Sequence, residues 1–220
     1  MLSCLFVAAA LGAPVDPPPA RYYFILYGGQ SLPFKPRTAH TWATFVKAAP
    51  DAAGVLCMES FTISWLPATG EVKPWRLRPE TGRNYSLAET FAIAAANKDR
   101  VSMWGPFEID ETRYQMAVAQ AAFLESGEVL YRAIDSFTRN IWIEHCVHAV
   151  TYADPILKER IQPVLQVGEP GTSRLAERYL KSGAFIGGAV THDWVLTATG
   201  ADQYPVIRRY PGERIRREFR

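Results

Sequence analysis

Two short stretches decide how this chain is expected to fold. Residues 143–150 read Ile-Glu-His-Cys-Val-His-Ala-Val, and residues 40–46 read His-Thr-Trp-Ala-Thr-Phe-Val. The first predicts a helix that begins near Cys146, and the second predicts a strand that His40 opens. Together they supply the minimum set for thiolate catalysis, because a helix N-terminus and a nearby imidazole both favour the thiolate over the thiol.

Composition indicates one globular domain with two short ends. The chain has 220 residues, of which 48% are hydrophobic and 21% are charged. We assign residues 21–207 to a single domain. The net charge is +2, and six arginines fall within residues 208–220, which predicts a solvated basic tail and no nucleic-acid partner.

The N-terminus resembles a targeting segment. Residues 1–13 are apolar and end in small residues, and Pro14 to Pro19 form a stiff spacer. Residues 1–20 are therefore interpreted as a signal peptide with a Pro-rich spacer, which predicts export to the periplasm or cell envelope. The alternative is the apolar end of a cytoplasmic protein. The segment is too short to span a bilayer, so no integral membrane segment is expected.

Between these ends, strand and helix patterns follow one another without regular alternation, which predicts an α+β domain. Ser86 and Glu89 have the spacing of a capping box, and Asp110 is a candidate N-cap for the following helix. Strands are predicted over residues 22–27, 40–46, 55–66, 72–77, 101–109, 129–134 and 204–207, and helices over 86–97, 110–125, 146–151 and 173–181.

Each candidate residue has a chemical role. Cys146 is the candidate nucleophile, His40 the candidate base, and helix N–H groups the candidate oxyanion donors. The group that orients His40 is expected among Glu59, Thr62 and Ser64, or at His192 and Asp193; we take Ser64 as the candidate. Candidate substrate-binding residues are Trp42, Trp65, Trp104 and His148.

Other uses of the cysteines and histidines are weaker. A metal site would combine Cys146 with His145, His148 and His192, but adjacent helical residues point about 100 degrees apart, so no metal is expected. Cys57 lies in an apolar run and is predicted to be a buried, inert thiol, with a disulfide to Cys146 as the alternative. No glycine-rich phosphate loop is present, and no cofactor is expected.

At these residues the chain resembles the permuted branch of the NlpC/P60 papain-like superfamily, which includes the lecithin:retinol acyltransferase-like proteins and uncharacterised bacterial families. The histidine opens an early strand, and Cys146-Val147-His148 is similar to the Asn-Cys-x-His pattern of the acyltransferase-like members. The sequence departs from that pattern at His145, where Asn is usual. The resemblance covers about residues 22–155.

The resemblance implies a small antiparallel sheet packed against a cysteine-bearing helix. It also implies a thiol hydrolase or acyltransferase that acts on an amide or ester bond of a small-molecule, peptide or lipid substrate. The alternative is an exported binding or envelope-associated domain that has kept the scaffold without the activity. Oligomeric state is left open.

Overall fold

The computed structural model describes residues 19–134, 140–157 and 168–215. Its elements are β1 (Arg21–Ser31), β2 (His40–Pro50), β3 (Leu56–Ile63), β4 (Trp65–Pro67), β5 (Glu80–Asn84), α1 (Leu87–Ala96), β6 (Asp99–Ile109), α2 (Glu111–Glu125), β7 (Leu130–Tyr131), β8 (Ile143–Glu144), α3 (Cys146–Thr151), α4 (Gly168–Lys181), α5 (Trp194–Thr199), the 3-10 helix Ala201–Gln203 and β9 (Ile207–Arg208). The predicted α+β class is confirmed. The interpreted signal peptide lies almost entirely outside the described residues.

Two sheets form the frame. The larger has the strand order β3-β2-β1-β6-β9, and the smaller has the order β4-β5-β7-β8. The long pairs β1–β2, β2–β3 and β1–β6 are antiparallel, and only the two-residue strands β8 and β9 join their neighbours in parallel. Short connections join β1 to β2 and β2 to β3, as suits antiparallel neighbours, whereas β6 returns to β1 from much later in the chain.

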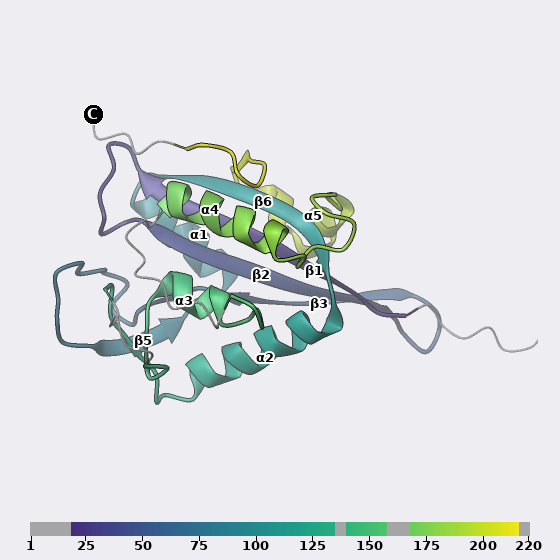
Figure 1. Ribbon diagram of the computed structural model, residues 1–220, viewed down its shortest axis with the longest axis horizontal. Coiled ribbons are helices and arrows are strands. Elements are labelled where there is room, and N and C mark those ends of the chain that lie inside the picture. The colour runs from purple at the N-terminus through teal and green to yellow at the C-terminus, as the bar shows by residue number, and fades with distance from the viewer. Residues whose placement is uncertain (1–18, 135–139, 158–167, 216–220) are drawn as a thin grey trace, which may run out of the picture.

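Helices cover both faces of the larger sheet, with α3 and α4 on the near face in Figure 1 and α1 behind it. Along β1, Phe24 and Leu26 belong to the cluster packed with α2, α3 and α4, whereas Ile25 and Tyr27 belong to the cluster packed with α1 and α5. Successive strand side chains point to opposite faces, and both faces of β1 are covered, so residues 22–27 are apolar and buried on both sides.

Local signals account for the helix starts. Ser86 caps α1, its hydroxyl accepts from the Glu89 amide, and the Glu89 side chain accepts from the Ser86 amide, which completes the predicted capping box. Asp110 caps α2 by accepting from the Arg113 amide. Both predicted N-termini are confirmed.

Three sequence predictions are wrong. Residues 55–66 do not form one strand, because the ladder with β2 ends at Ile63 and β4 joins the other sheet. Residues 72–77 form no strand. The expected basic tail is not simply solvated over its described part: Arg208 pairs in β9, and the Tyr210 carbonyl accepts from Trp104 Nε1 at 3.2 Å. Residues 216–220 lie outside the described residues.

Candidate functional site

His40 is the first residue of β2 and is 7% exposed. Its Nε2 lies 2.9 Å from the hydroxyl of Ser64, the residue at which the chain leaves β3 for β4. The Ser64 backbone is held on both sides, since its amide donates to Asn84 Oδ1 at 2.8 Å and its carbonyl accepts from the Tyr85 amide at 3.0 Å. The break in the strand therefore puts a fixed hydroxyl against the imidazole.

A second hydroxyl, that of Thr90, extends this contact. Thr90 of α1 can donate to Ser64 Oγ at 2.7 Å or to the Ser86 carbonyl at 2.8 Å, and it has one proton to give. If Thr90 donates to the carbonyl, Ser64 is left to accept from Nε2–H, and Nδ1 of His40 keeps a bare lone pair. If Thr90 donates to Ser64, the Ser64 hydroxyl turns to Nε2, and the proton of the ring sits on Nδ1. The two arrangements assign opposite roles to Nδ1.

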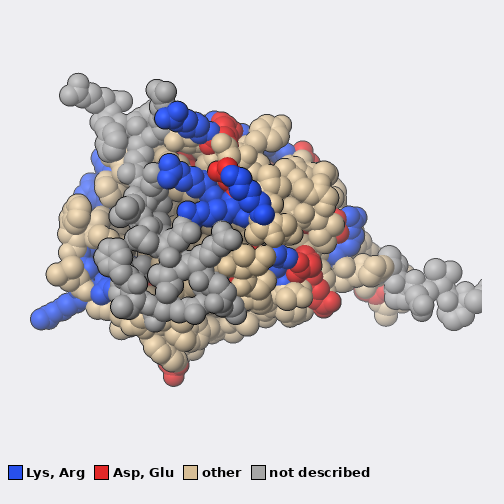
Figure 2. Space-filling view, viewed as in Figure 1, with Lys and Arg blue, Asp and Glu red and all other residues tan. Residues whose placement is uncertain are grey.

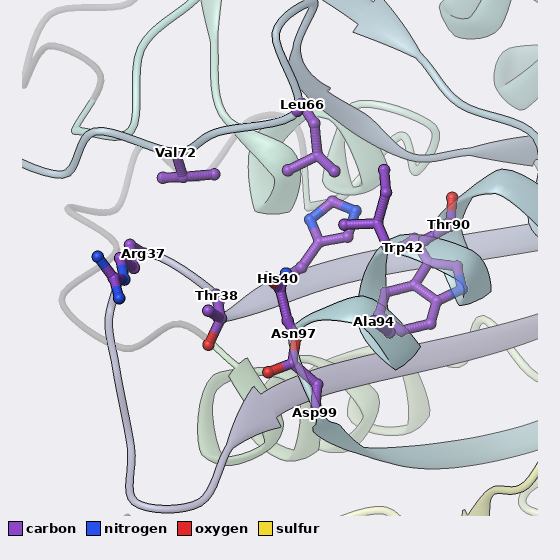
Figure 3. Close-up of a pocket in the computed structure, with 12 residues that line it drawn as sticks. Arg37, Thr38, His40, Trp42, Leu66, Val72, Thr90, Ala94, Asn97 and Asp99 are labelled. Carbon is purple, nitrogen blue, oxygen red and sulfur yellow. The ribbon is translucent and has the colours of Figure 1, made fainter.

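Nδ1 of His40 is buried and has no hydrogen-bond partner in the described part of the chain. Figure 3 shows one ring nitrogen turned toward Thr90 and the other turned away from it. The ring stacks on the Trp42 indole, with centroids 5.3 Å apart and planes 18° apart. Burial lowers the pKa of His40 to about 3, because the imidazolium loses its hydration, so the ring is neutral at neutral pH.

His40 opens onto a small hollow with a cavity volume of about 20 Å³ (Figure 3). Its lining combines apolar and polar side chains. The lining residues are Arg37, Thr38, His40, Trp42, Leu66, Gly70, Val72, Thr90, Ile93, Ala94, Asn97 and Asp99. Burial raises the pKa of Asp99 to about 6, and its Oδ1 makes no hydrogen bond within the described residues. Sequence reasoning missed Asp99, because its only signal is a single acid at a strand start.

Cys146 is the first residue of α3, as the sequence predicted, and its side chain is buried. His145 caps this helix: its Nδ1 accepts from the amides of Val147 at 3.0 Å and His148 at 3.3 Å. These two N–H groups are therefore already engaged, which corrects the expectation that the helix start offers several donors to an oxyanion. The histidine that stands where Asn was expected serves as the helix cap.

His148 is also engaged within this segment. It is buried, and its ring stacks between those of His145, with centroids 4.3 Å apart, and Tyr152, with centroids 5.6 Å apart. It does not line the hollow. Among the described residues, His148 therefore packs within α3.

The structure brings α3 against β2 but does not join the two candidate catalytic groups by a hydrogen bond. Helix α3 packs on the strand that His40 opens. The His40 ring shares its face of β2 with Trp42 and α1, whereas Cys146 lies in the cluster of the other face. Leu66 and Val72 belong to that cluster and also line the hollow, so they are the residues common to the two environments.

The three candidate tryptophans lie in different environments. Trp42 lines the hollow, as expected of a substrate-binding residue. Trp65 and Trp104 are 1% and 0% exposed, belong to the core cluster and do not line this hollow. Gly82 of β5 faces the Trp65 indole so closely that a Cβ there would overlap it.

The disulfide and the metal site considered as alternatives join residues that lie apart in the structure. Cys57 is exposed rather than buried, because the β2–β3 hairpin extends beyond the helices, and no disulfide joins it to Cys146. His192 lies against Tyr23 and Glu108, with its Nε2 3.7 Å from Glu108 Oε2. Across the ranges that the structure describes, no three His, Cys, Asp or Glu side chains are grouped so as to hold a metal ion.

Comparison of the chain with protein-family models, with curated proteins and with solved structures found no match in any of the three. Within the described residues, no helix combines the length and the apolar character needed to cross a membrane. Any functional assignment therefore depends on the residues and geometry above.

Proposed function

We propose that the protein is a thiol hydrolase or acyltransferase of the permuted papain-like type, in which Cys146 attacks an amide or ester carbonyl. One observation carries the proposal: Ser64 holds one nitrogen of a buried imidazole, while the other nitrogen lies without a partner at the end of the strand on which the cysteine helix packs. An imidazole oriented through one nitrogen and open at the other has the arrangement required of a general base.

The proposed chemistry uses the tautomer with Nδ1 bare. The thiol proton passes from Cys146 to Nδ1 of His40, a C–S bond forms at the carbonyl carbon, and the imidazolium returns the proton to the leaving amine or alcohol. Water, or a second nucleophile in the case of transfer, then attacks the thioester and releases Cys146. Ser64 is a positioning residue, because it acts on His40 and not on the substrate.

Contact between Cys146 and His40 requires movement at the end of β2 where His40 lies. The ladder between β2 and β3 ends at the pair Ala43–Ile63, so the His40 end of β2 has no β3 residue beside it. We propose that Leu66 moves aside there in the free protein as well as when substrate enters, which widens the hollow and brings the sulfur within about 3 Å of Nδ1, the reach of direct proton transfer. A thiolate opposite the ring would also raise the low pKa of His40.

The test is the alkylation rate of Cys146 by iodoacetamide as a function of pH. It is measured in a Cys4→Ser/Cys57→Ser background, since the exposed Cys57 would react as well. We expect Cys146 to react faster than a small reference thiol near neutral pH and to lose at least about tenfold of that rate in His40→Ala. Ser64→Ala should lower the rate as well, and Ser60→Ala is its matched control, because Ser60 is exposed on β3, four residues before Ser64.

A second candidate is an exported, non-catalytic binding domain on the same scaffold. The observation that favours it is the lack of a hydrogen bond between Nδ1 of His40 and any described residue, Cys146 included. It predicts that Cys146 reacts no faster than the reference thiol and that His40→Ala leaves its rate unchanged. The same alkylation profile therefore decides between the two candidates.

A further inference from the structure

The loop between β4 and β5 exposes two large apolar side chains. Trp75 is 84% exposed and Leu77 is 85% exposed, more than any other large hydrophobic residue that the structure describes. Neither belongs to a core cluster. Singly exposed apolar residues are ordinary on protein surfaces, but an exposed Trp and Leu two positions apart on one loop mark a surface that gains free energy when it is covered.

Basic residues alternate with these two side chains. The segment Lys73-Pro74-Trp75-Arg76-Leu77-Arg78-Pro79 has three cations. Glu71 and Glu80 pair with Lys73 at 3.7 Å and with Arg76 at 3.2 Å, which leaves Arg78 without an ion pair in the described ranges. Figure 2 shows basic side chains projecting from the end of the molecule at which this loop lies in Figure 1.

The loop has a defined shape. The Arg76 amide donates to the Lys73 carbonyl at 3.0 Å, and Pro74 and Pro79 restrict the backbone on both sides. Nη1 of Arg132, which follows β7, donates to the Leu77 carbonyl at 3.4 Å and adds a further cation beside the loop. A preformed tip loses little conformational freedom on binding.

We propose that residues 73–79 dock on an anionic lipid surface, with Trp75 and Leu77 inserted at the headgroup level and Lys73, Arg78 and Arg132 near the lipid phosphates. Trp favours the membrane interface because its ring is apolar and its N–H is polar. Cations beside an apolar tip match a negatively charged leaflet. A tip of two apolar residues is small for a protein interface, which usually engages some twenty residues a side.

The loop lies beside the hollow at His40, so docking would also place that hollow. Gly70 and Val72, which begin the same connection, line the hollow that His40 opens onto. A chain docked through residues 73–79 would hold that hollow close to the lipid surface. The docking itself is independent of the proposed catalysis, because vesicle binding is measured without turnover.

The experiment is cosedimentation of the full chain with vesicles of phosphatidylcholine alone and of phosphatidylcholine with phosphatidylserine. We expect binding to the anionic vesicles, weakened by salt, and weakened at least about tenfold in Trp75→Ala/Leu77→Ala. Val55→Ala/Leu56→Ala is the matched control, since those two residues are 61% and 55% exposed on the β2–β3 connection. It should bind like the unaltered chain.

Each other outcome overturns the proposal. Binding that survives Trp75→Ala/Leu77→Ala, or that both double variants weaken equally, would place the membrane contact elsewhere or make it unspecific. Equal binding to neutral and anionic vesicles would remove the role of the cations, and Lys73→Gln/Arg78→Gln should then change nothing. Failure to bind either vesicle, or self-association through this loop in light scattering, would also refute it.

Discussion

Replacing Ser64 with Ala probes the contact on which the catalytic proposal depends. In the proposed tautomer, Ser64 accepts from Nε2–H of His40. Ser64 is 0% exposed and His40 is 7% exposed, so water cannot replace the lost acceptor. Thr90 keeps its second acceptor, the Ser86 carbonyl, and only one donor is left bare. An unsatisfied buried donor costs about 1–3 kcal/mol of unfolding free energy.

The assay is urea unfolding followed by circular dichroism, with Ser60→Ala as the exposed control on the preceding strand, β3. We expect Ser64→Ala to lower the midpoint with an unchanged slope, and Ser60→Ala to change stability by less than about 0.5 kcal/mol. Nitrogen chemical shifts of the His40 ring should show the proton on Nε2. A proton on Nδ1 in the unaltered protein, or equal midpoints for the two variants, would refute the reasoning.

Three further predictions concern stability. The pKa of His40 is about 3 in the folded protein and near 6.5 in the unfolded chain, so the unfolded chain binds a proton first as the pH falls. The contribution of His40 to the free energy of unfolding is fully present above pH 6.5 and falls by on the order of 1.4 kcal/mol per pH unit toward pH 3. Urea unfolding of His40→Gln over the same pH range should lack this slope. The pKa of Asp99 is raised to about 6 in the folded protein, so the folded chain binds this proton first and Asp99 increases the free energy of unfolding as the pH falls below 6. Asp99→Asn removes that gain, so its free energy of unfolding should fall more steeply with acid in the same series of urea measurements. Gly82→Ala should lower the thermal midpoint by an amount equivalent to more than about 2 kcal/mol, because the Trp65 indole occupies the space of the new methyl group, whereas Thr81→Ala next to it should have little effect.

The predicted elements were most accurate where short-range chemistry decides them. The capping box at Ser86 and the N-cap at Asp110 act within one helical turn, so the sequence contains both partners. The long strands β1, β2 and β6 follow from runs of apolar and β-branched residues.

The errors arose where a pattern needs a partner that sequence does not show. Residues 72–77 alternate like a strand, yet Trp75 and Leu77 meet no neighbouring strand and remain exposed. Cys57 lies in an apolar run but sits where the β2–β3 hairpin extends past the helices. Burial is a property of what lies opposite a residue, and that is set by contacts distant along the chain.

The sequence by itself determined the α+β class, the helix starts and the placing of His40 on a strand and Cys146 at a helix start, because these depend on neighbours a few residues apart. Only the tertiary structure decided that Ser64 and Thr90 meet the imidazole, that Asp99 shares its hollow, and that His145 caps the cysteine helix while the sulfur packs on the other face of β2. Apart from the local cap at His145, these contacts join distant segments: His40 and Asp99 are 59 positions apart (99 − 40), and only the folded sheet brings such segments together.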